Sequence, residues 1–420
     1  MSEAKRLPGL DGLRGVAVAG VLLFHAGHFG GGFLGVDLFF ALSGFLITGL
    51  LLRDGTGSLR AFWGRRARRL LPALTVLLAG TTLAVWALGD RNLWSTALAD
   101  GPWVQANLVN WHLLAESAAY WDRFGPGRVF GHLWSIAVEE QFYLLWPVVV
   151  LLILRAGGRA EHRVALVAAL ASVLSLVLMV FLFTPSDSTR VYTGTDTRTF
   201  SLLLGALMAT APATRLVSKV AGREVVQAVL FGALAIFWLV ADGESAHWLF
   251  RGGLFAHSLL AAALIAVCAQ TPGSPVTRAL GWAPLRGLGS VSYSLYLWHW
   301  PVFLVLSEER LGMTGWARTA VVCAVSLALA VLSKVLVEDP IRFRATWARG
   351  RTGVAAVAVA TLALAALWIA VPRPPVVQVD VTGLMVAIGS PSRVSAAQVP
   401  AGRMSRMWLS RRSASRKPHS

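Results

Sequence analysis

The sequence has few charged residues for its length. Asp, Glu, Lys and Arg make up only 14% of its 420 residues, whereas soluble domains carry about a quarter. Hydrophobic residues make up 56%, and the mean hydropathy is +0.63. A soluble fold of this composition would leave too much apolar surface in contact with water. The shortage of charge therefore argues against a soluble protein and indicates an integral membrane protein.

Cysteine is scarce as well. Cys268 and Cys323 are the only two cysteines, and both fall inside apolar segments. Two such residues provide neither a disulfide framework nor the spacing of a metal site, so we expect no bound metal. Residues 1–8 lack the pattern of a cleaved signal peptide, and we expect the first apolar segment to remain in the protein as a helix.

Long apolar segments dominate what is present. A spanning helix needs about 20 mostly apolar residues, and eleven segments qualify or come close, the sixth being short. The sequence therefore predicts an all-α, polytopic transmembrane bundle with about 10–11 spanning helices. The segments lie near 12–28, 34–52, 70–88, 133–154, 163–183, 197–212, 224–241, 252–270, 287–306, 316–337 and 353–371.

The basic residues lie between these apolar segments. A net charge of +17 could indicate nucleic-acid binding, but the distribution is typical of topogenic charge in a membrane protein. If the N-terminus is cytoplasmic, most loop arginines fall on the cytoplasmic side, as the positive-inside rule requires. We therefore predict that orientation, with the lipid bilayer and no nucleic acid as partner. Residues 372–420 are expected to form a disordered basic tail.

Ionisable residues inside spanning segments are costly and usually mark function. Arg14 and His25 lie in the first segment, eleven residues apart. That spacing is about 16 Å along a helix and three turns plus roughly 20°, so both side chains share a face at opposite depths. Taken singly, Arg14 is more simply a snorkelling arginine and His25 a hydrogen-bonded core histidine.

Three further ionisable residues are predicted to reach the depth of His25. Asp37 opens the second segment, Glu139 lies in the fourth and His299 in the ninth. A carboxylate at that depth would orient the imidazole or raise its basicity. This convergence of His25, Asp37, Glu139 and His299 depends on the assigned segments and not on any pairing visible in the sequence.

The fourth segment carries its polar residues at helical spacing. His132, Ser135 and Glu139 fall at i, i+3 and i+7 and share one face. Glu140 is therefore expected to face another helix.

A run of arginines lies at the predicted cytoplasmic mouth of the third segment. It comprises Arg65, Arg66, Arg68 and Arg69. Such a run anchors topology, and guanidinium groups also bind phosphates bidentately.

The loop 89–132 is rich in aromatic residues. An aromatic belt at the membrane interface is the commoner explanation, and a surface that stacks on sugars is the alternative. The residues are Trp94, Trp103, Trp111, Tyr120 and Trp121.

Several motifs in order resemble the membrane acyltransferase family 3 over residues 7 to 345. The first three are Arg14 with His25, the stretch Gly-Val-Asp-Leu-Phe-Phe-x-Leu-Ser-Gly-Phe-Leu-Ile that contains Asp37 and Ser43, and the arginine run before Leu71-Pro72. The others are His132-x-Trp-Ser135-x-x-Val-Glu139-Glu140-Gln-Phe-Tyr, Thr197-Arg198, Tyr293-Ser-Leu-Tyr-Leu-Trp-His299 and Val-Glu338-x-Pro-x-Arg342.

The resemblance implies an enzyme that O-acylates carbohydrates at a bacterial cytoplasmic membrane. The donor would be acyl-CoA, often acetyl-CoA, used as a substrate with no permanently bound cofactor. The family's functional residues carry over to Arg14, His25 and the arginine run; further pocket candidates are Ser43, His132, Ser135, Glu140, Arg198, Tyr293 and His299. Residues 1–345 would form the acyltransferase domain, 346–371 an additional helix and 372–420 the tail.

These inferences combine into one mechanistic hypothesis. Acyl-CoA would place its phosphates on Arg14 and the arginine run, and its thioester beside His25. His25 would act as general base or carry the acyl group, with Asp37 or Glu139 orienting it. The alternatives are a transporter and a subunit that passes acyl groups to a separate extracytoplasmic esterase or transferase. The second arises because some members of the family add an SGNH-type domain, whose Gly-Asp-Ser motif the tail lacks.

Overall fold

The computed structural model describes residues 7–374 apart from 56, 117–126 and 244–245. Within these residues the chain is helical and forms no named strand, with one isolated bridge between Thr184 and Asp187. The all-α fold class is therefore confirmed. The predicted tail, 372–420, lies outside the described residues except for its first three.

A helix occupies each of the eleven expected segments. These helices are α1 (Pro8–His25), α2 (Gly35–Asp54), α3 (Leu59–Ala87), α6 (Trp134–Arg155), α7 (Ala160–Leu182), α9 (Thr195–Met208), α11 (Glu224–Val240), α12 (Gly253–Gln270), α14 (Ala283–Val305), α16 (Gly315–Ser333) and α17 (Gly350–Ala370).

Shorter helices connect them. They are α4 (Arg91–Gln105), α5 (Val109–Ala115), α8 (Thr189–Thr193), α10 (Ala211–Ala221), α13 (Pro275–Leu280) and α15 (Glu308–Leu311), with 3-10 segments η1 (Gly30–Leu34), η2 (Gly131–Leu133) and η3 (His247–Leu249). The chain after α16 continues in two π-helical segments, η4 (Lys334–Glu338) and η5 (Pro340–Arg344).

Seven of the described helical stretches are long and apolar enough to cross a membrane. The bent pair of α9 and α10, which meet at 74°, would make an eighth, and α11 is a shorter apolar helix. The chain is thus a multi-pass membrane protein by helix length and composition. The expected number of 10–11 spans is not reached on this criterion, because α1 and α14 are not among the qualifying helices. The cytoplasmic placement of the N-terminus stays a prediction.

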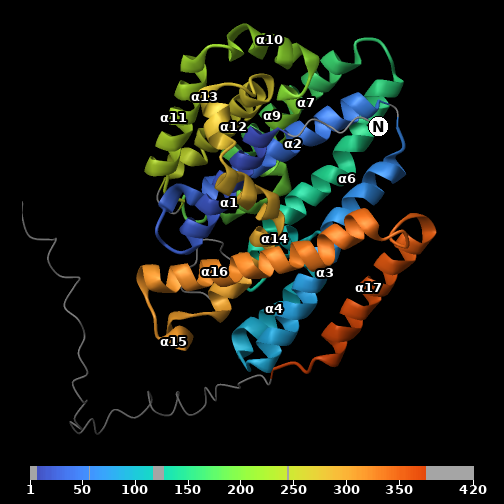
Figure 1. Cartoon of the computed structure of the whole chain (residues 1–420), viewed down its shortest axis with the longest axis vertical. Helices are drawn as coiled ribbons and strands as arrows, with labels where there is room; N and C mark the ends of the chain where they lie inside the picture. The colour runs from blue at the N-terminus through green and yellow to red at the C-terminus, as the bar shows by residue number, and fades with distance from the viewer. Residues whose placement is uncertain (1–6, 56, 117–126, 244–245, 375–420) are drawn as a thin grey trace, which may run out of the picture. The chain divides into compact units, whose positions relative to one another are not determined.

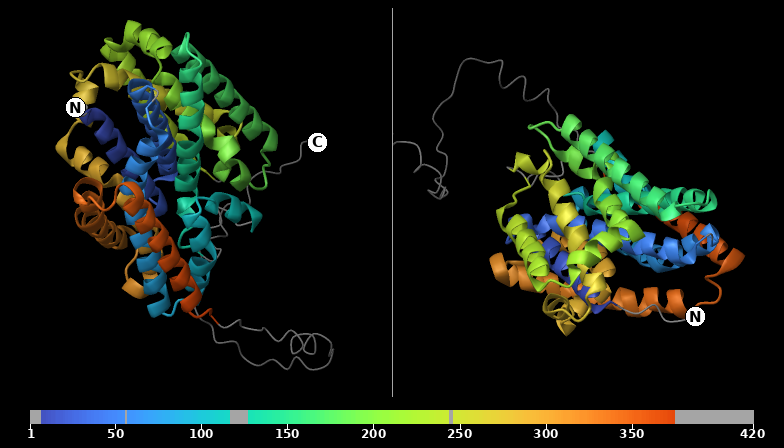
Figure 2. Two further views of the ribbon diagram at one scale, coloured as in Figure 1. Left: turned by 90° about the vertical axis from the view of Figure 1, so that its right-hand side faces the viewer. Right: turned by 90° about the horizontal axis from the view of Figure 1, so that it is seen from above.

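The helices α1 and α14 pack against each other and lie mostly buried, whereas α17 lies at the periphery beside α3 and α4 (Figures 1 and 2). The contact between α1 and α14 is close because glycines of each helix lie against the backbone of the other. A Cβ atom on Gly289 would lie 1.8 Å from the Asp11 carbonyl oxygen, and one on Gly15 would lie 2.2 Å from that of Leu285. Small residues allow this approach in membrane helix pairs. Here they allow close contact between the N-terminal halves of α1 and α14.

Glycines also allow close contact between α2 and α9. A Cβ atom on Gly44 would lie 1.8 Å from the Leu202 carbonyl oxygen, and one on Gly205 would lie 2.0 Å from that of Ala41. The two glycines therefore fix how the polar residues of α2 face those of α9.

We predict that Gly44→Ala destabilises the protein by about 1–3 kcal/mol, the usual cost of overpacking. Gly232→Ala is the matched control, because Gly232 lies inside α11 and a Cβ atom added there would meet nothing outside its own helix within 4 Å. Alanine gains about 1 kcal/mol over glycine in a helix, so the control should be neutral or stabilising. Thermal unfolding of the purified proteins in detergent measures both, and equal effects would contradict the proposed contact.

Candidate functional site

Two histidines meet where α1 and α14 come together. The His25 Nδ1 atom lies 3.1 Å from His299 Nε2, and His299 Nδ1 lies 2.6 Å from the Tyr296 carbonyl oxygen. A carbonyl only accepts, so His299 Nδ1 carries the proton and, in the neutral ring, His299 Nε2 accepts. His25 Nδ1–H is therefore the donor between the two rings. This assignment leaves the lone pair of His25 Nε2 available as a base or nucleophile.

A third histidine, His132, lies beside this pair and bonds to a carbonyl oxygen that a proline leaves without its helical donor. Pro301 has no N–H, so the carbonyl four residues earlier, that of Leu297, loses its helical partner. The His132 Nε2 atom lies 3.1 Å from that oxygen and donates to it. The His132 ring then stands edge-on to the ring of His299, with centroids 5.3 Å apart. We call His25, His132 and His299 the histidine cluster.

Hydrogen bonds between α6 and α14 support the cluster. The Tyr296 hydroxyl donates to the His132 carbonyl oxygen at 2.9 Å and lies 2.6 Å from Ser135 Oγ. His132, Ser135 and His299 were predicted as pocket residues, and the structure brings them together with His25. The cluster lies at the C-terminal end of α1 (His25), in η2 (His132) and in the C-terminal half of α14 (His299), with His25 half-buried and His299 fully buried.

The expected contact of Asp37 with His25 is wrong, because Asp37 is paired elsewhere. Its Oδ1 atom accepts from Arg198 Nη2 at 2.8 Å, from Ser201 Oγ at 2.8 Å and from Ser258 Oγ at 3.2 Å. All four side chains are buried among α2, α9 and α12. Arg198 was a pocket candidate, and from α9 it pairs with one oxygen of the buried carboxylate. Asp37 Oδ2 and the Nε and Nη1 atoms of Arg198 have no hydrogen-bond partner among the described residues.

The expectation that Glu139 orients His25 is also wrong. The Glu139 carboxylate accepts from the hydroxyl groups of Ser43 and Tyr143. On α6 it lies seven residues from His132, which is about 10 Å along the axis. Glu139 therefore lies deeper in the bundle than the histidine cluster. Asp37 and Glu139 lie on the predicted helices, α2 and α6, but their hydrogen-bond partners are not the predicted His25.

Glu140 lies beside Glu139, within electrostatic range of Arg66 and Arg69. Tyr293 is close to these charges and donates its hydroxyl proton to the Leu70 carbonyl oxygen at 2.9 Å. The two candidates thus belong to the arginine side of the bundle and not to the histidine cluster.

Four arginines gather from three segments of the chain. Arg69 interacts electrostatically with Arg66, Arg14 and Arg342, and we call these four the arginine cluster. The Arg66 guanidinium also lies 4.0 Å from the centroid of the Tyr143 ring. Arg14 pairs with Asp11 at 3.5 Å. Glu140 and Glu338 lie within electrostatic range of Arg69, but among the described residues Arg14 is the one member of the cluster with an ion pair within 4 Å. Like charges held together in this way are suited to an anion with several negative charges.

Arg342 belongs to the motif Val-Glu338-x-Pro-x-Arg342 but was not predicted as a site residue. It lies in η5, and a π-helical segment often marks a functional site. Arg65 is exposed and pairs with Asp54 at 3.2 Å. It lines a hollow of about 250 Å³ between α2, α3 and α6. Arg68 lies on the same helix, half-buried.

Arg128, which shortly precedes η2, is linked to the histidine cluster through Trp300. The Trp300 Nε1 atom donates to the Arg128 carbonyl oxygen at 2.9 Å, and the Trp300 ring lies 4.7 Å from that of His25. Arg128 Nη1 in turn donates to Asp100 Oδ1 at 2.7 Å. Burial raises the pKa of the Asp100 carboxyl group, while Arg128 and His112 act in the opposite direction. Sequence reasoning missed this chain of contacts because it joins three distant segments.

We predict that Pro301→Ala lowers activity without lowering stability. Alanine restores the N–H that bonds the Leu297 carbonyl oxygen, so it competes with His132. It also removes a helix-interior proline, which costs about 3 kcal/mol. Initial rates and thermal unfolding of the same preparations measure the two effects.

Pro102→Ala is the control, since Pro102 is an exposed proline inside α4. It should leave activity unchanged. An active Pro301→Ala protein would show that the contact between His132 and Leu297 has no role at the site.

The chain is similar to known proteins over most of its length. A family model described as an acyltransferase domain matches residues 7–335. Among curated proteins, the chain is 39% identical over 353 residues to the putative peptidoglycan O-acetyltransferase YrhL of Bacillus subtilis, covering 80% of this chain and 55% of that protein. It is 35% identical over 356 residues to the peptidoglycan O-acetyltransferase OatA of Listeria monocytogenes, covering 80% and 56%.

The O-acetyltransferase OatA of Staphylococcus aureus is 34% identical over 357 residues, covering 81% of this chain and 58% of that protein. The chain thus spans a little over half the length of these curated relatives. No solved structure matches it significantly.

Proposed function

The chain belongs to the acyltransferase family whose model matches residues 7–335, and on that premise we propose that it is an O-acyltransferase of a bacterial cytoplasmic membrane. It would move an acyl group, most simply acetyl, from cytoplasmic acyl-CoA to a hydroxyl group of a carbohydrate. The names of the relatives, peptidoglycan O-acetyltransferases, support a carbohydrate acceptor and an acetyl group.

The contact between His25 Nδ1 and His299 Nε2 is the observation that carries this proposal, because it leaves the lone pair of His25 Nε2 to react. It would accept the proton of the acceptor hydroxyl while the hydroxyl oxygen attacks the thioester carbonyl. The tetrahedral intermediate then collapses, and the CoA thiolate leaves with a proton. The contact from His25 Nδ1–H to His299 Nε2 holds the ring in the required tautomer. The same lone pair could instead carry the acyl group before transfer.

The arginine cluster supports an acyl-CoA donor. Arg14 and His25 share α1, and eleven residues separate them by about 16 Å along the helix. Phosphates bound at the arginine cluster would leave the extended pantetheine arm of the donor to follow α1 toward the histidine cluster. No resident cofactor is needed in this scheme, because the acyl donor is itself a substrate.

His25→Ala should lower acetyl transfer from acetyl-CoA to a peptidoglycan-derived glycan by at least about 100-fold, because a general base contributes 10²–10⁴-fold. The protein should still fold, since His25 is half-buried at a helix end. Transfer of labelled acetyl groups by purified protein in nanodiscs measures this. His162→Ala, at an exposed histidine of α7, is the control. Near-normal transfer by His25→Ala would refute the mechanism.

Replacing Arg66 and Arg69 together by Met should raise the KM for acetyl-CoA by about 10–100-fold, the worth of one or two charge-assisted hydrogen bonds. The kcat/KM for acetylpantetheine, which lacks the nucleotide phosphates, should stay unchanged. Arg215→Met, at an exposed arginine of α10, is the control. An equal loss with both donors would show that the cluster does not bind phosphates.

A second candidate is a subunit that passes acyl groups to a separate extracytoplasmic transferase. It is favoured by the placement of Arg14 and His25 about 16 Å apart along α1, because an acyl group could pass from one cluster to the other along this helix. Transfer to the glycan by the purified chain alone would exclude it. Turnover of acetyl-CoA that requires an added protein would support it.

A further inference from the structure

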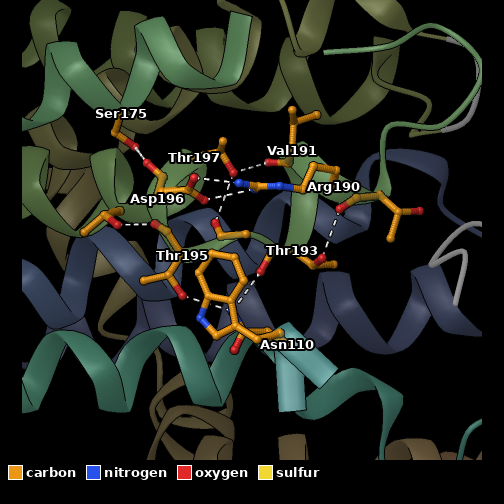
Figure 3. Close-up of polar contacts among 12 residues, drawn as sticks. Asn110, Ser175, Arg190, Val191, Thr193, Thr195, Asp196 and Thr197 are labelled. Atoms are coloured by element: carbon orange, nitrogen blue, oxygen red, sulfur yellow. Dashed lines mark hydrogen bonds and ion pairs between the residues drawn. The ribbon is translucent and has the colours of Figure 1, made fainter. Parts of the chain in front are cut away.

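A polar corner lies where α8 and α9 meet α5 and α6, and Figure 3 shows its side chains. Arg190 donates to both carboxylate oxygens of Asp196, at 3.0 and 2.6 Å. The Asn110 amide donates to the Thr193 carbonyl oxygen at 3.2 Å and to Thr195 Oγ1 at 2.9 Å. These contacts make the corner rigid and give it a fixed set of donors and acceptors.

Trp111 lies on this corner with a large part of its ring exposed. Its Nε1 atom donates to Gln141 Oε1 at 3.4 Å, and the Arg190 guanidinium lies 5.5 Å from the ring centroid. The side chain remains 38% exposed. A Trp ring that is anchored at its edge and exposed on its surface is suited to stack against a flat partner.

The turn before α5 is held in an unusual conformation. Asn107 has a φ of 57°, the one non-glycine residue with positive φ among those described. Its carbonyl oxygen accepts from Gln141 Nε2 at 2.7 Å. Asn adopts this conformation readily, and here it follows the C-terminus of α4 and ends that helix. The turn fixes the start of α5 and hence the position of Trp111.

The charges beside Trp111 argue against a belt that faces lipid. The side chains of Arg190 and Asp196 are 35% and 32% exposed, and exposed charges are costly in contact with hydrocarbon. The corner therefore faces water or headgroups. It also lies at the end of the bundle that holds the histidine cluster, because α5 packs against η2, which carries His132.

We propose that this corner is a subsite for a pyranose ring of the acceptor carbohydrate. Trp111 stacks on the apolar face of the ring, while Arg190 donates to its hydroxyl groups and Asp196 accepts from them. Arg190 and Asp196 neutralise each other, so an uncharged sugar binds without burying a net charge. The proposal rests on the proposed function and gives the acceptor a place on the protein.

Trp111→Ala should raise the KM for a glycan acceptor by about tenfold, as expected when an aromatic anchor is removed. The KM for acetyl-CoA should not change, and Trp111→Phe should restore much of the affinity because it retains a stacking ring. The control is Trp103→Ala. Trp103 is a 44% exposed residue of α4 that stacks on His112. If the aromatic residues only anchor the protein at the interface, both alanine variants will behave alike, which would overturn the proposal.

Direct binding separates this proposal from the proposed function. Equilibrium dialysis of radiolabelled chitotetraose against protein in nanodiscs needs no turnover, and His25→Ala protein serves as an inactive but binding-competent sample. Tighter binding by the His25→Ala protein than by a His25→Ala/Trp111→Ala protein supports the subsite, even if acetyl transfer is never observed. Equal binding by the two proteins, or no binding by either, refutes it whatever the activity.

Discussion

A polar group inside a lipid-embedded bundle must find its partner within the protein, because the surrounding hydrocarbon offers none. This constraint explains how the ionisable residues of the chain are distributed. Asp37 is met by Arg198 and two serines, and Glu139 by two hydroxyl groups. Each of these carboxylates thus has a partner on a neighbouring helix, although Asp37 Oδ2 has no hydrogen-bond partner among the described residues. His25 remains half-buried, with one nitrogen committed to His299 and the other free to react.

Prolines inside helices provide some of these partners. Pro301 leaves the Leu297 carbonyl oxygen without its helical donor, and His132 takes that place. Pro147 does the same in α6, where the freed Tyr143 carbonyl oxygen accepts from Trp63 Nε1 at 3.0 Å. In both cases the carbonyl oxygen that the proline leaves without a helical donor accepts a hydrogen bond from another segment of the chain. The prolines thus connect α14 with η2, which together carry two members of the histidine cluster, and α6 with α3, which carries Arg66 and Arg69.

Hydrophobic segments predicted the helices, and helical spacing predicted that Arg14 and His25 share a face at opposite ends of α1. The partners could not be predicted, because they depend on which helices touch and how they are rotated. Asp37 follows His25 by only twelve residues, yet the contact of Gly44 with Leu202 turns α2 toward α9 and Arg198. The sequence did hold one usable signal: Pro301 implied a free carbonyl oxygen beside His299. Arg342 could be placed only once the structure showed it within electrostatic range of Arg14 and Arg69.

A neutral histidine is the less costly way to orient a catalytic base in this environment. A carboxylate beside His25 would have to be kept ionised at low dielectric, and burying a charge costs several kcal/mol even when it is paired. In the proposed mechanism His299 would perform the same orienting role, with its own tautomer set by the Tyr296 carbonyl oxygen, so the pair would carry no net charge until a proton arrives from the acceptor. The positive charge that then forms on the imidazole is shared across the contact between the two rings. It is lost again when the thiolate of the donor is protonated. The proposed cycle therefore places a charge among the histidines only during transfer, while the permanent charges of the arginine cluster stay about 16 Å away along α1.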